Sequence, residues 1–62
     1  MAKQINSVKD IKVGDIIKST QDWHLSGEVV QIDKYYVRYK SVRTGLIQPI
    51  HVDNISHYEI IN

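Results

Sequence analysis

Hydrophobic and polar positions alternate along most of the chain from residue 13 onward, with the period of two that is typical of β-strands. No segment keeps a helical period for more than one turn. Turn-forming residues interrupt the alternation at a spacing of about 8 to 12 residues, which favours a small barrel or sandwich. The pattern predicts five short strands, at residues 16–20, 27–32, 35–40, 46–52 and 57–61.

Local motifs refine this outline. The stretch from Ser7 to Asp10 has the Ser-x-x-acid spacing of a capping box, which predicts one short helical turn. Residues 53–56 suit a single 3₁₀ turn before the last strand. Pro49 donates no ladder hydrogen bond, so its strand should be an edge strand, or be bulged or bent at that residue. We expect residues 1–6 to form a loose N-terminal arm.

Alternation also assigns the two faces of each predicted strand. In the third strand, Tyr35, Val37 and Tyr39 fall on the apolar side, and Tyr36, Arg38 and Lys40 fall on the other. We expect the apolar side of each strand to face inward, because burial of apolar surface drives folding. The predicted core is Val13, Ile17, Val30, Ile32, Val37, Tyr39, Leu46, Ile50, Val52, Ile55, Tyr58 and Ile60.

Four stretches, "KVGDIIKS", "GEVVQI", "YYVRYK" and "IHVDNISHYEII", together resemble the small SH3-like barrels of the KOW and Tudor type. In those barrels Val-Gly-Asp opens the first strand and Gly-x-Val-x-x-Ile marks the second, a spacing that Gly27, Val29 and Ile32 fit. The closing stretch is similar to that of the YkvS-type small proteins of Firmicutes, a family of unknown function. The resemblance covers residues 11–61.

The strand pattern and the resemblance together predict an all-β fold. We expect a single small five-stranded SH3-like barrel with a short N-terminal arm and a 3₁₀ turn before the last strand. Residues 1–10 would form the arm and residues 11–62 the barrel. KOW modules commonly bind RNA or ribosomal and transcription proteins, and Tudor modules bind methylated side chains through an aromatic cage. The resemblance therefore implies a binding function.

Composition argues against several classes of chemistry. The chain has no cysteine, so neither a disulfide nor a thiolate metal site can form. No apolar run approaches the roughly 20 residues that a membrane span needs, and the polar start lacks the apolar stretch of a signal peptide. We expect a cytoplasmic monomer that contacts no membrane. No nucleophile motif surrounds any serine or histidine, so we expect no enzymatic activity and no cofactor.

The net charge of +1 hides an uneven distribution. No acidic residue lies between Asp33 and Asp53, and that window holds two lysines and two arginines. The rest of the chain has four lysines against seven acidic residues. This segregation indicates either an anionic partner or a solvated strand face whose neighbours supply the carboxylates.

Tyr36, Arg38 and Lys40 are the main candidate partner-binding residues, because they place an aromatic ring beside two cations on one outward face. Such a face suits a nucleic-acid base on the ring with phosphates on the cations, and it also suits an acidic protein partner. The structural alternative is a solvated face in which the Arg and Lys stems cover the tyrosine ring. Lys18 and Arg43 extend the set.

Trp23, in the polar loop 21–26, completes the candidate site. It acts either as an aromatic anchor, since Trp and Tyr are frequent in binding hot spots, or as a cap over one end of the barrel. His51, Asp53 and His57 lie close in sequence, as metal ligands can, but polar residues at a strand end are more often simply exposed. We expect no metal site.

Three binding functions remain open. The first is a protein-interaction adaptor that uses Trp23 and the strand edge around Pro49, where a partner strand can add. The second is a KOW-like, nucleic-acid-binding accessory module that uses the basic and aromatic strand face. The third is a Tudor-like cage of Trp23 with tyrosines, which needs several rings around one pocket. We favour the adaptor over the nucleic-acid module because the net charge is small.

Overall fold

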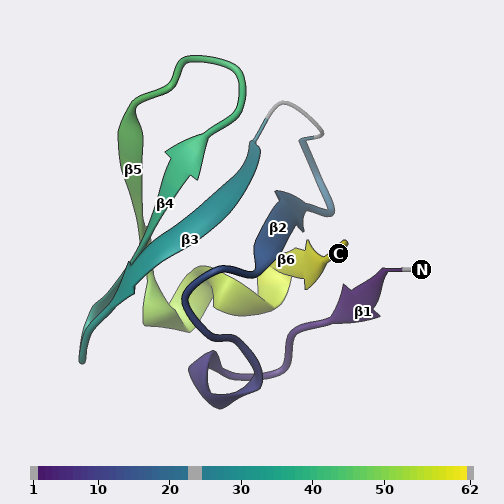
Figure 1. Cartoon of the computed structure of the whole chain (residues 1–62). Helices are drawn as coiled ribbons and strands as arrows, with labels where there is room; N and C mark the ends of the chain where they lie inside the picture. Colours follow the sequence, from purple (N-terminus) through teal and green to yellow (C-terminus); the bar gives the residue numbers. More distant parts are fainter. Residues whose placement is uncertain (1, 23–24, 62) are drawn as a thin grey trace.

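Short antiparallel strands build the fold, as the alternation predicts. The computed structural model describes residues 2–22 and 25–61, and it contains six strands and two 3₁₀ helices (Figure 1). The elements in chain order are β1 (Lys3–Gln4), η1 (Val8–Asp10), β2 (Ile16–Ser19), β3 (Ser26–Ile32), β4 (Tyr36–Ser41), β5 (Ile47–His51), η2 (Val52–His57) and β6 (Tyr58–Ile60). All five predicted strands are confirmed, and their ends differ from the prediction by at most one residue.

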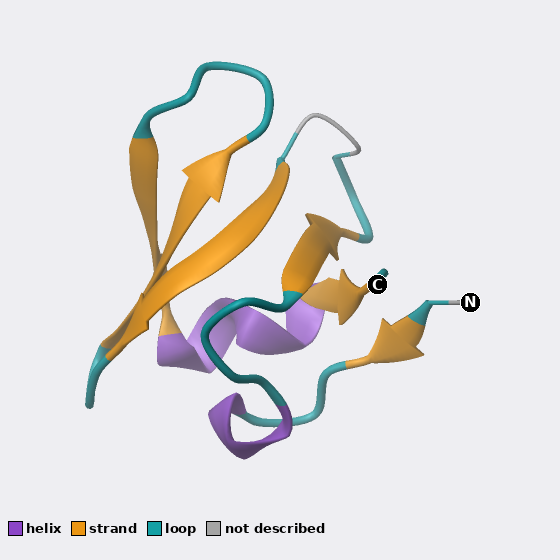
Figure 2. Cartoon of the chain, viewed as in Figure 1, coloured by secondary structure: helices purple, strands orange, loops and turns teal. Residues whose placement is uncertain are grey.

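The strands form one antiparallel sheet in the order β1-β6-β2-β3-β4-β5. β1 and β5 are its two edges, so hydrogen bonds do not close the described sheet into a barrel. The prediction of a closed five-stranded barrel is therefore wrong in strand number and in closure. The chain enters η2 directly after β5, and η2 leads it across the end of the sheet to β6 (Figure 2). No helix in the described ranges is long and apolar enough to cross a membrane.

Residues 3–5 belong to the sheet and the core rather than to a loose arm. Lys3 and Gln4 pair with Ile60 and Glu59 of β6, which makes β1 an integral strand of the sheet. The next residue, Ile5, has a fully buried side chain. The sequence does not predict this strand, because residues 1–6 show no alternation of hydrophobic and polar positions. The strand forms by pairing with β6, which lies more than fifty residues away in the chain.

The predicted capping box is confirmed. The Ser7 hydroxyl accepts a hydrogen bond from the Lys9 N–H, and the Asp10 carboxylate accepts one from the Ser7 N–H at 3.1 Å. The Asn6 N–H donates to the same carboxylate at 2.9 Å. These two backbone donors, that of Asn6 foremost, hold the pKa of Asp10 below its ordinary value of 3.8.

The core differs from the predicted set both outside the strands and within β3. Three residues of that set are exposed: Val13 and Leu46 lie in turns outside the strands, and Val30 lies at an irregularity in β3. Alternation does not govern turn residues, so it misplaced Val13 and Leu46. The buried hydrophobic residues are Ile5, Ile11, Ile17, Val29, Val37, Tyr39, Ile50, Ile55 and Ile60, with Val8, Ile32, Val52 and Tyr58 partly buried against them.

A β-bulge explains the inversion within β3. Val29 pairs with Tyr39 of β4, but the next paired residue is Gln31, opposite Arg38, so Val30 is the extra residue. The extra residue shifts the alternation by one position. Val29 is consequently fully buried, whereas Val30 is 39% exposed.

Candidate functional site

The three residues singled out on the third predicted strand share the outward face of β4. Tyr36 and Lys40 are exposed and Arg38 is half-buried, while Val37 and Tyr39 between them are buried. The alternation of β4 therefore places one aromatic ring and two cations on a single rigid strand.

β5 supplies the other half of this surface. Its register places His51 opposite Tyr36, Pro49 opposite Arg38 and Ile47 opposite Lys40. Ile47 is 51% exposed and Tyr36 is 41% exposed. We call this surface the β4–β5 face, made of Tyr36, Arg38, Lys40, Ile47, Pro49 and His51. The period of two along a strand puts residues 47, 49 and 51 on one side, but only the register shows which β4 residue each one faces.

Arg38 is held in place on this face. Its guanidinium forms an ion pair with Asp33 and lies 5.7 Å from the centroid of the Tyr36 ring. Asp33 also accepts hydrogen bonds from the backbone N–H groups of Tyr35 and Tyr36, at 2.9 and 2.7 Å. The Tyr36 N–H and then the Arg38 side chain hold the pKa of Asp33 below its ordinary 3.8. The positive charge of Arg38 is therefore largely offset within the chain.

Tyr36 is oriented by His51 as well as by Arg38. The two rings meet edge to face, with centroids 5.4 Å apart, an arrangement that aromatic rings prefer. His51 Nδ1 accepts a hydrogen bond from the Asp53 N–H at 3.1 Å and so caps the first turn of η2. The aromatic part of the face is thus fixed to the start of a helix.

Lys40 and Arg43 lie toward the other end of the face. Lys40 is flanked by Ile47 on β5 and by Glu28 on β3, and Arg43 lies in the exposed turn after β4. Neither cation forms an ion pair with a carboxylate in residues 2–22 or 25–61. Two exposed apolar residues of the same turn, Val42 and Leu46, are 74% and 61% exposed.

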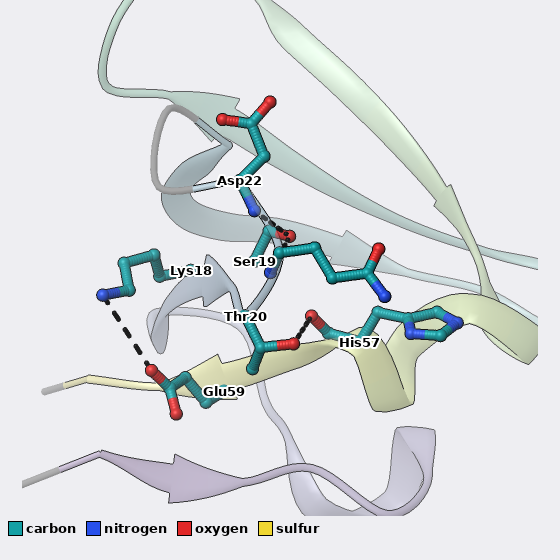
Figure 3. A network of polar contacts seen from close by, with 7 residues as sticks. Lys18, Ser19, Thr20, Asp22, His57 and Glu59 are labelled. Carbon is teal, nitrogen blue, oxygen red and sulfur yellow. Dashed lines mark hydrogen bonds and ion pairs between the residues drawn. The ribbon is translucent and has the colours of Figure 1, made fainter.

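Lys18 does not join this group. It lies on β2, from which β4 is separated by β3, and its ammonium is 4.0 Å from the Glu59 carboxylate on β6 (Figure 3). Beyond it, the Thr20 N–H and hydroxyl both donate to the carbonyl oxygen of His57, at 2.8 and 2.9 Å. These contacts tie the end of β2 to η2 and β6. Trp23 lies outside the described residues, so its predicted role stays a prediction.

The described tyrosines do not gather around one pocket. Tyr39 and Tyr58 pack within the molecule with ring centroids 6.3 Å apart, and burial raises the pKa of both hydroxyls. Tyr35 is 57% exposed beneath the ammonium of Lys34, which lies 5.4 Å from its ring centroid. The ring beside Tyr36 belongs to a histidine rather than to a tyrosine.

β5 is an edge strand, as Pro49 predicts. Backbone hydrogen bonds join Ser41 N–H to the Leu46 carbonyl and Val52 N–H to the Tyr35 carbonyl on either side of the β4–β5 ladder. Bonded and non-bonded pairs alternate in an antiparallel ladder, so Pro49 occupies a non-bonded position with its nitrogen directed away from β4. Its missing N–H costs the sheet no hydrogen bond and leaves the outer edge of β5 without a donor at its centre.

Two cavities lie away from the β4–β5 face. One, of about 340 Å³, lies between β1, η1 and the start of β2, and its lining includes Lys3, Lys9 and Lys12. The carboxylates of Asp10 and Asp15 line the same space, so its net charge is small. The other, of about 350 Å³, lies between the two 3₁₀ helices. No group of three or more potential metal ligands occurs among the residues that the structure describes.

No family model, no curated protein and no solved structure matches the chain. The chain is a small all-β protein with a six-stranded antiparallel sheet in its described residues.

Proposed function

We propose that the chain is a non-enzymatic protein-interaction module that binds its partner across the β4–β5 face. The observation that carries this proposal is the composition of the face: Tyr36 and Arg38 stand beside exposed Ile47 and Pro49 on two hydrogen-bonded strands. Tyrosine and arginine are frequent in binding hot spots. Because the rings and the guanidinium are already fixed by neighbours, little further ordering is needed on binding.

A protein partner suits this face better than a nucleic acid. The Arg38 charge is offset by Asp33, and Glu28 stands opposite Lys40 on β3. Nucleic-acid binding without sequence preference relies on a row of cations along a backbone. The exposed apolar side chain of Ile47, which lies beside Lys40 on the face, is better matched by apolar atoms of a protein.

The partner would contact side chains rather than add a strand. Strand addition requires regular donors and acceptors along a free edge, and Pro49 removes the donor at the centre of the β5 edge. Prolines at edges are a common device against such pairing. We therefore propose an adaptor that binds its partner through the side chains of the β4–β5 face and not through the edge of β5.

We propose that the chain is a small SH3-like module of the KOW and Tudor type, in which β1 is an addition at one edge. The supporting observation is the short 3₁₀ helix immediately before the last strand. A binding role is consistent with such folds, although fold alone does not determine function.

The test is capture of a partner by the immobilised chain from a lysate of its own cells. Tyr36→Ala and Ile47→Ser should each reduce the captured partner, because both remove contact area from the face. The matched control is Tyr35→Ala, which removes an exposed tyrosine next in the chain but outside the face. Equal capture by wild type and both face variants would refute the proposal.

A nucleic-acid-binding module is the second candidate, and the acid-free window around Lys40 and Arg43 is the observation in its favour. Fluorescence anisotropy with single-stranded RNA and DNA tests it directly. The nucleic-acid reading requires binding that weakens steeply as salt is raised. Absence of binding at low salt would remove this candidate.

A further inference from the structure

The four cations of the acid-free window are not equivalent. Arg38 is paired with Asp33, and Lys34 lies over the ring of Tyr35. Lys40 and Arg43 have no ion pair with any carboxylate of the described chain. These two are therefore the cations on and beside the β4–β5 face that remain available to an external anion.

Both available cations stand beside exposed apolar side chains. Lys40 is the cross-strand partner of Ile47, and the turn that holds Arg43 also holds Leu46. Ile47 and Leu46 are 51% and 61% exposed. A partner that binds this end of the face must therefore offer both apolar side chains and negative charge.

The amount of charge limits the kind of anion. Glu28 faces Lys40 from β3, so this end of the face keeps a net charge of about one positive unit. The sugar–phosphate backbone of a nucleic acid brings one negative charge per nucleotide and favours a longer row of cations. One or two carboxylates beside an apolar side chain match the face more closely.

We infer that the partner segment is both acidic and apolar: its carboxylates meet Lys40 and Arg43, and its apolar side chain packs on Ile47. This inference rests on the proposed protein-interaction function and specifies the chemistry of the partner. Complementary charges at such a rim chiefly set specificity and association rate. The apolar contact supplies most of the affinity.

The experiment follows the amide signals of the full chain by NMR during titration with three probes. The first is a short synthetic peptide with two leucines flanked by glutamates. The second is the same peptide with glutamines in place of the glutamates, and the third is a short single-stranded RNA. The glutamate peptide should shift the amides of residues 40, 43, 46 and 47. The glutamine peptide should bind about tenfold more weakly, since two exposed ion pairs are lost.

Two variants test the residues. Lys40→Gln combined with Arg43→Gln should weaken binding of the glutamate peptide about tenfold, whereas Lys34→Gln, from the same acid-free window, should leave it unchanged. All of these residues lie at the surface, so the variants should keep the dispersed spectrum of the folded chain. Raising the salt concentration should reduce the preference for the glutamate peptide, because it shortens the screening length.

Several outcomes would overturn the inference: no shifts with the glutamate peptide, equal affinity for both peptides, or an equal loss with Lys34→Gln. Stronger shifts of the same amides by the RNA would assign the cations to a nucleic acid instead. These failures are separable from failure of the proposed function. If the lysate partner is lost with Tyr36→Ala but retained by the Lys40 and Arg43 double variant, the protein-interaction function stands and only the acidic character is wrong.

Discussion

Gly27 of β3 packs directly against the backbone of Lys40 on β4. A Cβ atom at Gly27 would lie 2.0 Å from the Lys40 carbonyl oxygen and 2.8 Å from Cδ2 of the Tyr39 ring. The close approach lets the buried Tyr39 ring pack against the β3 backbone, and it joins β3 to the strand that carries the candidate face. Glycine is required here for space, not for a special backbone angle.

Gly27→Ala should therefore destabilise the chain strongly, by about 3 kcal/mol, because strand backbones must separate to admit the methyl group. The comparison variant is Gly45→Ala. Gly45 has a φ of 75° but open space around its Cβ position, so its cost is about 1 to 2 kcal/mol of backbone strain. Urea denaturation measures both. A cost for Gly27→Ala no greater than that for Gly45→Ala would show that the strands are not in this contact.

Two adjacent valines test the bulge in β3. Val29→Ala should lower the free energy of unfolding by about 2 kcal/mol, because two buried carbon atoms are lost and a cavity remains. Val30→Ala should change it by less than about 0.5 kcal/mol, as is usual at exposed positions. The reverse order would mean that β3 is regular and that Val30 faces the core.

Ile5 tests the role of the N-terminal segment. Because its side chain is fully buried, Ile5→Ala should cost about 3 kcal/mol in thermal or urea unfolding. Ile61→Ala is the matched control at the other end of the chain, where the side chain is 40% exposed, and should cost less than about 1 kcal/mol. Similar losses from the two variants would place the first residues outside the core.

Acid should destabilise the fold through Asp10 and Asp33. Hydrogen bonds from backbone N–H groups, with the Arg38 side chain added at Asp33, hold both pKa values below the ordinary 3.8 in the folded chain. A lowered folded-state pKa contributes stability that is present above pH 3.8 and is lost as the pH falls through the folded value. Urea midpoints measured across this range should therefore fall toward low pH.

The double variant Asp10→Asn with Asp33→Asn identifies the groups responsible. Its stability should be lower than that of the wild type at neutral pH and should depend less on pH below 3.8, because neither position can then take up a proton. An unchanged acid dependence in this variant would assign the effect to other carboxylates.

His51 should stabilise η2 through its ring nitrogen. His51→Ala removes the acceptor for the Asp53 N–H and should cost about 1 kcal/mol, as loss of a helix N-cap does. His51→Asn also removes the ring that touches Tyr36 but restores a side-chain acceptor, so it should recover most of that loss. Equal costs for the two variants, measured by thermal unfolding, would assign the effect to the ring contact with Tyr36.

The sequence predicts much of the candidate site. Alternation correctly separated Tyr36, Arg38 and Lys40 from Val37 and Tyr39, because a regular strand points successive side chains to opposite sides. Alternation did not reveal that Arg38 forms an ion pair with Asp33. Lys18 was grouped with this set on charge alone. The sheet order places Lys18 two strands from β4, and its ammonium lies beside the Glu59 carboxylate.

The sequence by itself determined where five of the six described strands lie, where the 3₁₀ turns form and that the strand with Pro49 is an edge. These features depend on side-chain alternation, capping and the missing proline donor, all of which act within a few residues. The tertiary structure alone decided the bulge at Val30, the burial of Ile5, the open sheet and the pairing of β4 with β5 that assembles the face. Each of these depends on contacts between residues distant in the chain, whose free energies no local pattern contains.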